Sequence, residues 1–554
     1  MILLRPPNSE PLKTKRTTLR STPVDTIDSV FTVCRRTLGR DTWGRVRAAL
    51  DADLPEESFP AAIDTLTVPL DLPGYLADLA RLEWVYYRTK SDATDTMVPV
   101  TGLTVNPSFT LQALSWKNLA SFFGGQADRG TPVKAPNHVM TWRHPQSGQL
   151  FCREALENDL LSLKIAVERI DPRDAARQGQ VTPGNIQAII EQAVARGILL
   201  APDSRVRRNT HPQTANQPEL QPFQAADIFT LQWHVTQKCD LHCKHCYDRS
   251  NRTALPLAQA RAVLDDFYDF CRRMHVRGQV TFSGGNPLLY PHLEELYRTA
   301  HRLGFGIAIL GNPTPVEQLR RLVEIVPPLF FQISLEGLEA HNDFIRGAGH
   351  FKRSLAFLDD LRELGIYSMV MLTLTRDNLD QVLPLADLLK GRTDAFNFNR
   401  LAAVGEGAGL LMPTREDFKT FLRDYQKAAG SNPILGFKDN LFNLIKWEGG
   451  EALLGGCTGF GCGAAFNFLS LLSDGEVHAC RKFPSLIGNI QADNLYDIYH
   501  SQAAADYRAG SAACENCAKN LVCRGCLAVA YSLGLDIFTE KDPFCDHIPS
   551  PPAG

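Results

Sequence analysis

The chain has 554 residues, of which 44% are hydrophobic and 21% charged, as in globular proteins with apolar cores. Its formal net charge of -3 gives no general attraction to nucleic acid or anionic lipid. No apolar run reaches the roughly 18 residues that cross a bilayer, and the apolar piece at residues 2–4 is too short for a signal-peptide core. We therefore expect a cytoplasmic protein of roughly three or four domains, without membrane or nucleic-acid partners.

The amino-terminal third has no cysteine clusters and mostly helical patterns. Apolar residues recur at helix-like spacing between residues 25 and 89, which predicts a helical domain over residues 1–135. Residues 136–205 carry further apolar helices and end in a short apolar strand. Residues 206–226 are polar and contain Pro, Gln and Asn, which predicts an exposed linker.

Strands and helices are expected to alternate through residues 227–435. The expected strands are residues 228–236, 279–283, 305–310, 329–335, 367–374 and 395–400. The expected helices are residues 255–272, 293–303, 316–326, 351–364 and 379–389. This alternation predicts α/β units with parallel strands and right-handed crossovers. Six units predict a partial (β/α)6 barrel of the TIM type, short of the full eight.

Cysteine usage is the most informative feature of the sequence. Of fourteen cysteines, eleven fall into two groups. Disulfides are rare in a reducing compartment, so clustered cysteines indicate metal ligands. The three isolated cysteines are expected to be small buried apolar residues. They are Cys34, Cys152 and Cys271.

The first group lies directly after the first strand of the alternating region. Cys239, Cys243 and Cys246 are separated by three and two residues. Three thiolates on a loop at the mouth of a barrel can hold three irons of a 4Fe–4S cube and leave the fourth open. A zinc site usually takes four ligands, and His242 or His245 would have to complete it.

This spacing, followed by Tyr247, resembles the signature of the radical S-adenosylmethionine (SAM) superfamily. The resemblance covers residues 229–401 and implies that SAM chelates the open iron at the catalytic cysteines. Reductive cleavage of SAM would then give methionine and a 5′-deoxyadenosyl radical that removes a hydrogen atom from the substrate. A low-potential electron donor such as flavodoxin or ferredoxin is implied as a partner.

Other segments resemble the SAM-binding segments of the superfamily. Residues 283–287, Ser-Gly-Gly-Asn-Pro, are similar to its GGEP loop, with Asn286 in the place of the usual Glu. Ser334 and Glu336 match a strand whose Ser and acid meet SAM, and Glu336 would accept hydrogen bonds from ribose hydroxyls. Arg346 either pairs with the SAM carboxylate or is a solvated arginine at a helix end. The implied SAM contacts are Tyr247, Ser283, Gly284, Gly285, Asn286, Ser334, Glu336 and Arg346.

Residues 436–554 are expected to be irregular, with metal ligation supplying much of their folding energy. Their cysteine spacing resembles the SPASM domain, the auxiliary-cluster module of peptide-modifying radical SAM enzymes. The resemblance implies two further 4Fe–4S clusters, three in all. One would be held by Cys457, Cys462, Cys480 and Cys526, and the other by Cys514, Cys517, Cys523 and Cys545. The alternative is a pair of structural zinc sites, because Cys-x2-Cys pairs also serve zinc.

Two features bear on the substrate. Arg481 and Lys482 stand where SPASM sulfatase maturases have a presumed base, Asp, which argues against sulfatase maturation. These cations either steer an acidic peptide or carboxylate, or belong to an ordinary exposed loop. Residues 136–205 resemble winged-helix domains of ribosomal-peptide maturases, which dock a leader peptide at a sheet edge. Residues 457–483 resemble the maturases of so-called selenobiotic precursors.

Three hypotheses follow. The first is a peptide maturase that installs a crosslink or an oxidised residue in a ribosomally made precursor. The second keeps the enzyme class but acts on a protein, as sulfatase maturases do, or on a small molecule. The third is a non-enzymatic binding protein stabilised by zinc or clusters, and the intact group of Cys239, Cys243 and Cys246 argues against it.

Overall fold

The computed structural model describes residues 26–91, 99–123, 130–209 and 217–547. The chain divides at residues 203/204 into two compact units. The start of the chain, considered above for a signal peptide, and residues 210–216 of the expected linker lie outside the described residues. No helix in the described ranges has the length and apolar character needed to span a bilayer.

The amino-terminal unit begins with helices, as expected for residues 25–89. They are α1 (Ile27–Val30), α2 (Thr32–Ala49), η1 (Glu56–Ser58), α3 (Phe59–Leu66) and α4 (Leu76–Ser91). Phe31 and Phe59 are fully buried between them, with ring centroids 4.2 Å apart. The buried carboxylate of Glu83 on α4 accepts the backbone N–H of Cys34 at 2.8 Å, which ties α4 to the start of α2.

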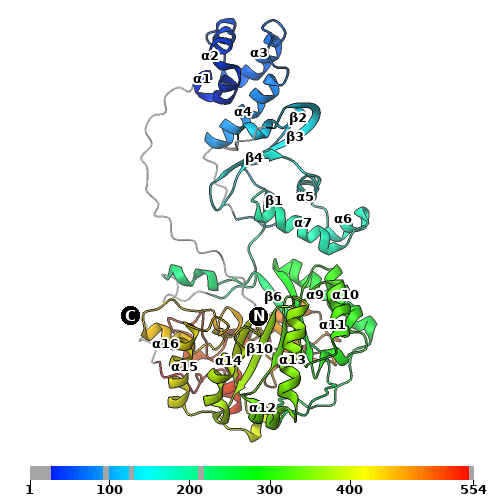
Figure 1. Ribbon diagram of the computed structural model, residues 1–554, viewed down its shortest axis with the longest axis vertical. Coiled ribbons are helices and arrows are strands. Elements are labelled where there is room, and N and C mark those ends of the chain that lie inside the picture. The colour runs from blue at the N-terminus through cyan, green and yellow to red at the C-terminus, as the bar shows by residue number, and fades with distance from the viewer. Residues whose placement is uncertain (1–25, 92–98, 124–129, 210–216, 548–554) are drawn as a thin grey trace. The chain divides into compact units, whose positions relative to one another are not determined.

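A small antiparallel sheet and three helices complete this unit (Figure 1). The strands, in the order β2-β3-β4, are β2 (Thr110–Lys117), β3 (Val133–Arg143) and β4 (Leu150–Glu154). The helices are α5 (Glu157–Glu168), α6 (Pro172–Gly179) and α7 (Pro183–Ala195). The remaining elements are the antiparallel pair β1 (Thr104–Val105) and β5 (Leu199–Leu200), and the turn η2 (Leu119–Phe122).

The strands β1 and β2 differ from the helical character expected for residues 1–135. Strand β2 pairs with β3 across the expected boundary at residues 135/136, with Leu111 opposite Met140. Of β2 only Leu114 is buried, so the strand has a weak apolar alternation that the stronger helical patterns obscure.

The carboxyl-terminal unit contains the alternating region, and all six expected strands are present. They are β6 (Ile228–Thr236), β7 (Arg277–Gly284), β8 (Gly306–Leu310), β9 (Phe331–Ser334), β10 (Ser368–Leu374) and β11 (Ala395–Arg400). These strands pair in parallel in sequential order. The expected helices are confirmed as α9 (Leu257–Met274), α10 (Leu293–Arg302), α11 (Val316–Ile325), α13 (His350–Glu363) and α14 (Val382–Leu389). Continuous apolar runs identify strands buried on both faces, which explains this agreement.

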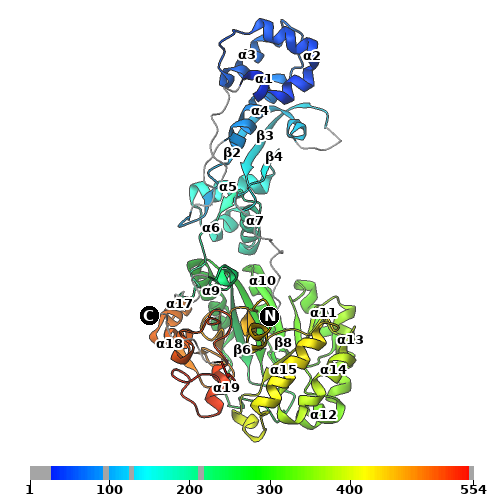
Figure 2. The same cartoon turned by 90° about the vertical axis from the view of Figure 1, so that its left-hand side faces the viewer.

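Several elements between and after the expected ones are additional. They are η3 (Pro218–Phe223), η4 (Pro287–Leu289), α12 (Glu339–Arg346), η5 (Arg376–Gln381), η6 (Gly405–Gly409), α15 (Arg415–Ala429) and α16 (Phe442–Glu448). Helices α11, α13 and α14 lie on the side of this unit opposite α17, α18 and α19 (Figure 2). The last three helices are α17 (Leu495–His500), α18 (Gln502–Ala509) and α19 (Leu527–Ser532).

The cysteine-rich segment extends the barrel sheet instead of forming a separate layer. Strand β12 (Phe468–Leu471) pairs in parallel with β6, with Phe468 opposite Thr230. Strands β13 (Glu476–His478) and β14 (Leu486–Asn489) follow in antiparallel order and complete a nine-stranded sheet. The other elements of this segment are the turns η7 (Gly456–Thr458) and η8 (Ala512–Cys514).

The described parts of the expected linker are exposed only in part, since buried residues alternate with exposed ones. Val206 and Leu220 are buried, and the guanidinium of Arg208 donates to the carbonyls of Phe460 at 3.0 Å and Cys462 at 2.6 Å. The polar composition of this segment therefore concealed a few residues that anchor it to the cysteine-rich region.

Candidate active site

Cavities in the carboxyl-terminal unit bring the clustered cysteines together in three sets. The triad, Cys239, Cys243 and Cys246, lines a large cavity of about 340 Å³. The inner quartet lines a second cavity and consists of Cys457, Cys462, Cys480 and Cys526. The outer quartet lines a third cavity and consists of Cys514, Cys517, Cys523 and Cys545. The two quartets match the groupings that the SPASM resemblance implied.

The isolated cysteines lie apart from these cavities. Cys34 and Cys271 are buried, and Cys152 is partly buried on β4. None of them lines the three cavities described above.

Most of the expected SAM contacts line the large cavity together with the triad. They are Tyr247, Ser283, Gly284, Gly285, Ser334 and Arg346. These residues follow the carboxyl ends of β6, β7 and β9, except Arg346, which ends α12. Loops at the carboxyl ends of parallel strands meet at one edge of the sheet, which is why segments far apart in sequence share this cavity.

Two expected contacts do not line the cavity, and the first is Asn286. Its side chain is buried and donates to the carboxylate of Asp240, inside the triad loop, at 3.0 Å. Asn312, after β8, donates to the same carboxylate at 2.7 Å and to the Cys239 sulfur at 3.6 Å. Both amides therefore hold the loop that carries the triad.

The glycines of the loop after β7 allow a close backbone contact with the triad loop. Gly284 has φ +141°, a conformation that favours glycine. A Cβ atom on Gly285 would lie 2.6 Å from the Gln237 carbonyl oxygen and still closer to that of Lys238. The sequence suggested that these glycines make room for SAM, and the structure adds that they make room for the triad loop.

We expect Gly285→Ala to displace the triad loop, because the new methyl group meets backbone atoms that cannot rotate away. The free energy of unfolding should fall by about 1–3 kcal/mol, as for other overpacked sites, and SAM cleavage should slow. Gly409→Ala is the matched control, since a Cβ there meets open space. Thermal unfolding measures the stability of each variant, and 5′-deoxyadenosine formation measures its SAM cleavage. Equal stability and equal SAM cleavage in the two variants would contradict the close contact between Gly285 and the triad loop.

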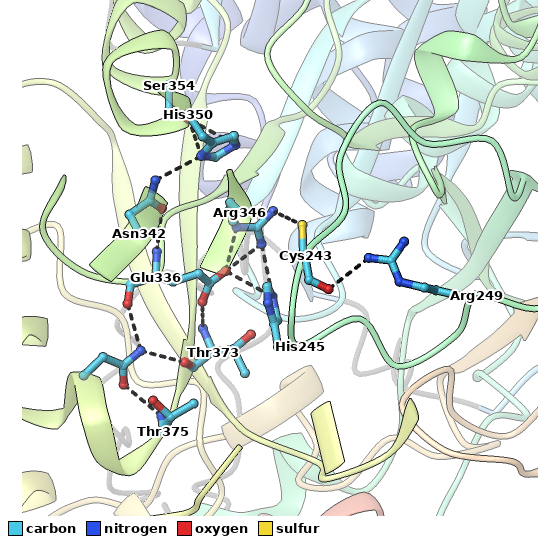
Figure 3. A network of polar contacts seen from close by, with 11 residues as sticks. Cys243, His245, Arg249, Glu336, Asn342, Arg346, His350, Ser354, Thr373 and Thr375 are labelled. Atoms are coloured by element: carbon cyan, nitrogen blue, oxygen red, sulfur yellow. Dashed lines mark hydrogen bonds and ion pairs between the residues drawn. The ribbon is translucent and has the colours of Figure 1, made fainter. Parts of the chain in front are cut away.

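The second expected contact outside the cavity is Glu336. Only 1% of this residue is exposed, and both carboxylate oxygens have protein partners (Figure 3). One oxygen accepts from Arg346 Nε at 2.9 Å and lies 3.2 Å from His245 Nε2. The other accepts the backbone N–H of Thr373 at 2.7 Å. The structure thus directs Glu336 into the protein, in contrast to the ribose contact that the resemblance implied.

Arg346 connects this buried carboxylate to the triad. Its side chain is 9% exposed, which excludes the solvated arginine considered from the sequence. Besides Glu336, its guanidinium donates to the sulfur of Cys243 at 3.7 Å (Figure 3). Burial would raise the pKa of Glu336, but His245 and Arg346 lower it far below its ordinary value, so the pair is fully ionised. An ionised pair therefore fixes Arg346 beside a triad cysteine.

Arg400 lies in the wall between the large cavity and the inner quartet. It lines both cavities, as do Asn399 and Lys482. Its guanidinium donates to Asp439 at 2.8 Å and to both oxygens of Asp542 at 2.9 and 2.7 Å. Asp542 also accepts the backbone N–H of Cys526 at 2.8 Å and lines the outer-quartet cavity. One buried ion cluster therefore connects all three cysteine sets.

The donor chemistry of both quartets fits iron–sulfur clusters. Burial raises the pKa values of Cys462 and Cys514 to about 12, so these thiols stay protonated unless a metal displaces the proton. In the outer-quartet cavity, the ammonium of Lys519 is buried and has no hydrogen-bond partner among the described residues. A buried cation next to four cysteines suits a group with negative charge.

No set of three or more His, Cys, Asp or Glu side chains in the described part of the chain is arranged to hold a metal ion. A cube binds each thiolate through a different iron, so its ligands surround a space instead of converging on one point. The arrangement of the cysteines around cavities is compatible with cubes.

Sequence reasoning missed three residues of this site in whole or in part. The sequence motifs assign no role to Asn312, and they place Arg400 only at the end of an expected strand. Arg481 was noted as a cation, but its partner Ser283 lies 198 positions earlier. Their common signal is a polar residue just after a buried strand or a cysteine, which indicates a position without naming its partner.

A parallel six-stranded sheet with cysteines at its carboxyl edge, extended by a second cysteine-rich module, defines a class of iron–sulfur enzymes. Family models agree: the Radical SAM superfamily model matches residues 233–389, and an iron–sulfur cluster-binding domain model, SPASM, matches residues 462–527. The chain belongs to the radical SAM superfamily and carries a SPASM domain. Its cofactors are SAM and 4Fe–4S clusters.

Two curated relatives and one solved structure illustrate the range of similar proteins. Mycofactocin maturase of Mycolicibacterium smegmatis is 30% identical over 332 residues, 57% of this chain and 82% of that protein. The AdoMet-dependent heme synthase of Methanosarcina barkeri is 25% identical over 349 residues, 58% of this chain and 96% of that protein. The crystal structure of Streptococcus suis SuiB is 16% identical with a TM-score of 0.48, covering 74% of this chain and 97% of that one.

Proposed function

We propose that this enzyme is a peptide maturase that abstracts a hydrogen atom from a ribosomally made precursor and installs a crosslink or an oxidised residue. The observation that carries the proposal is the large cavity, because its walls include both the triad and residues shared with the inner quartet. A substrate in this cavity lies beside the source of the radical and beside a site for electron transfer. Similarity to mycofactocin maturase supports the same reading.

The proposed ligands are the triad for the SAM-binding cluster and the two quartets for two auxiliary clusters. When bound, the SAM-binding cluster would supply the electron for the reductive cleavage of SAM. The two auxiliary clusters would supply electron transfer. The chain itself contributes positioning: Asn286 and Asn312 hold the triad loop through Asp240, and Arg346 holds Cys243. Such positioning aligns a reactive group with its target atom. Flavodoxin or ferredoxin is the proposed electron donor.

The amino-terminal unit supports a peptide substrate because it offers sheet edges. Strands β2 and β4 flank β3, and neither pairs with a further strand within the described residues. An extended leader peptide can add to such an edge through main-chain hydrogen bonds. We propose that residues 136–205, together with the edge strand Thr110–Lys117, form the docking site for the leader.

The test is anaerobic incubation of the reconstituted enzyme with SAM, a reductant and short peptides encoded beside its gene. We expect 5′-deoxyadenosine together with a peptide that has lost two hydrogen atoms, as mass spectrometry would detect. A matched peptide that lacks its leader should react far more slowly. Equal rates for both peptides would contradict leader docking, and unchanged peptides despite 5′-deoxyadenosine formation would contradict the maturase proposal.

The second candidate is a radical SAM enzyme for a small molecule. The similarity to AdoMet-dependent heme synthase, which spans 96% of that relative, favours it. The same incubation separates the candidates, because a small-molecule enzyme leaves every peptide unchanged. A sulfatase-maturase activity receives no support from Arg481, which stands in the place of the presumed base.

A further inference from the structure

The large cavity has an excess of positive side chains. Those that line it are Arg249, Arg346, Arg400, Arg481 and Lys482. Asp248 is the carboxylate among the described lining residues, and it lies 3.7 Å from the guanidinium of Arg252. A substrate that enters this cavity therefore meets several cations, and each of them either has an acidic partner in the protein or is available to bind an anion.

Three of the arginines already have acidic partners. Arg346 pairs with Glu336 at 2.5 Å, and Arg400 pairs with Asp542 at 2.7 Å. Arg249 lies 3.6 Å from Glu406. The charges of these arginines are balanced within the protein.

Lys482 has a different counter-charge. It lines the inner-quartet cavity as well as the large one. The negative charge of a cluster held by the inner quartet would balance the positive charge of this lysine.

Arg481 remains without an acidic partner among the described residues. It lines the large cavity but not the inner-quartet cavity. Its Nη1 donates to the Ser283 hydroxyl at 3.1 Å, and its guanidinium carbon lies 5.5 Å from the centre of the Tyr247 ring. These contacts fix the guanidinium but leave most of its five N–H donors without a protein partner among the described residues.

The neighbouring His234 carries no charge that could balance that of Arg481. Its side chain is buried in the same cavity wall, with Nε2 3.2 Å from the Tyr247 hydroxyl. Burial, followed by the charge of Arg481, lowers the pKa of His234 to about 3. This histidine is neutral at physiological pH.

We propose that Arg481 binds a carboxylate of the substrate and so orients it between the triad and the inner quartet. The proposal rests on the proposed function, which it deepens by naming the side-chain carboxylate of an acidic residue as the recognised group. A planar guanidinium can donate two parallel hydrogen bonds to a carboxylate, which fixes orientation as well as position. Ser283 and Tyr247 hold this guanidinium in advance, which reduces the entropy lost on binding.

The probe is a pair of synthetic pools of acetylated, amidated octapeptides that differ only in a fixed central residue, Glu in one and Gln in the other. The pools are mixed with the reconstituted, SAM-bound protein without oxygen, and the retained peptides are counted by mass spectrometry after ultrafiltration. We expect wild-type protein to retain the Glu pool about tenfold better, the effect of one charge-assisted pair. Arg481→Gln should reduce this ratio to about one, and Arg481→Lys should keep part of it.

Arg415→Gln, at an exposed position at the start of α15, is the matched control and should keep the wild-type ratio. Iron content and the far-ultraviolet circular dichroism spectrum show that each variant is folded and loaded. A wild-type ratio of one, or an unchanged ratio in Arg481→Gln, overturns the inference.

SAM also carries a carboxylate, so its affinity is measured in the same variants. We expect Arg481→Gln to leave the Kd of SAM unchanged. A tenfold weaker SAM affinity would assign the carboxylate to SAM and overturn the inference. A wild-type protein that forms no 5′-deoxyadenosine would overturn the proposed function itself, whereas a ratio of one with normal 5′-deoxyadenosine overturns only the role of Arg481.

Discussion

Simultaneous replacement of Cys239, Cys243 and Cys246 by Ala should abolish SAM cleavage and leave the auxiliary clusters in place. The triad lines the large cavity and neither quartet shares a cysteine with it. Three cubes of four irons predict about 12 iron atoms per chain, and loss of one cube leaves about 8. Iron analysis measures the iron content, electron paramagnetic resonance detects the auxiliary clusters, and chromatography of 5′-deoxyadenosine measures SAM cleavage.

Cys152→Ala is the control for the loss of a thiol, because Cys152 lies on β4 in the other unit. It should keep both the full iron content and SAM cleavage. Formation of 5′-deoxyadenosine by the triple variant would show that the radical arises elsewhere. Two or three zinc atoms and no iron in the wild-type protein would instead favour structural zinc sites.

The second large effect concerns stability. Arg400→Met should lower the free energy of unfolding by about 3–5 kcal/mol, because it leaves buried Asp439 and Asp542 without their cation. Burial would lower the pKa of Arg400, but both carboxylates raise it well above its ordinary value, so the charge is present in the folded protein. Chemical unfolding of the reconstituted protein without oxygen measures the change.

A surface ion pair provides the comparison. Arg423 lies 3.2 Å from Glu448, and both side chains are roughly half exposed. Arg423→Gln should therefore cost less than about 1 kcal/mol. Similar losses for Arg400→Met and Arg423→Gln would mean that the buried cluster does not join the barrel to the cysteine-rich segment.

The sequence predicted the barrel well because its strands are buried on both faces. Ile228–Thr236 mixes apolar residues with Thr, Gln and His but is buried along most of its length, and the structure has a strand with the same bounds. The amino-terminal sheet escaped prediction because Thr110–Lys117 buries only one residue, Leu114. Its partner strand, Val133–Arg143, is not adjacent in sequence, and pairing between separated strands leaves no local pattern.

The candidate site was predictable where spacing alone defines it. The cysteines follow short fixed intervals, and their grouping in the cavities agrees with the groups implied by the SPASM resemblance. The directions of polar side chains were not predictable in this way. Glu336 points toward Arg346, at the end of α12, and Asn286 points toward Asp240, in the triad loop. Each partner belongs to another segment of the chain. Burial and charge pairing decide such orientations only once the chain is folded.

The parallel pairing of β12 with β6 makes the cysteine-rich module part of the barrel's own hydrogen-bonded framework. Removal of the module would remove β12 from beside β6. The N–H and C=O groups on that side of β6 would then be unpaired, and such an exposed strand edge promotes aggregation. The module is thus inseparable from the barrel. Because the triad loop follows β6 and Cys480 follows β13 in the same sheet, the backbone ladder fixes the relative positions of the strands that carry these cysteines.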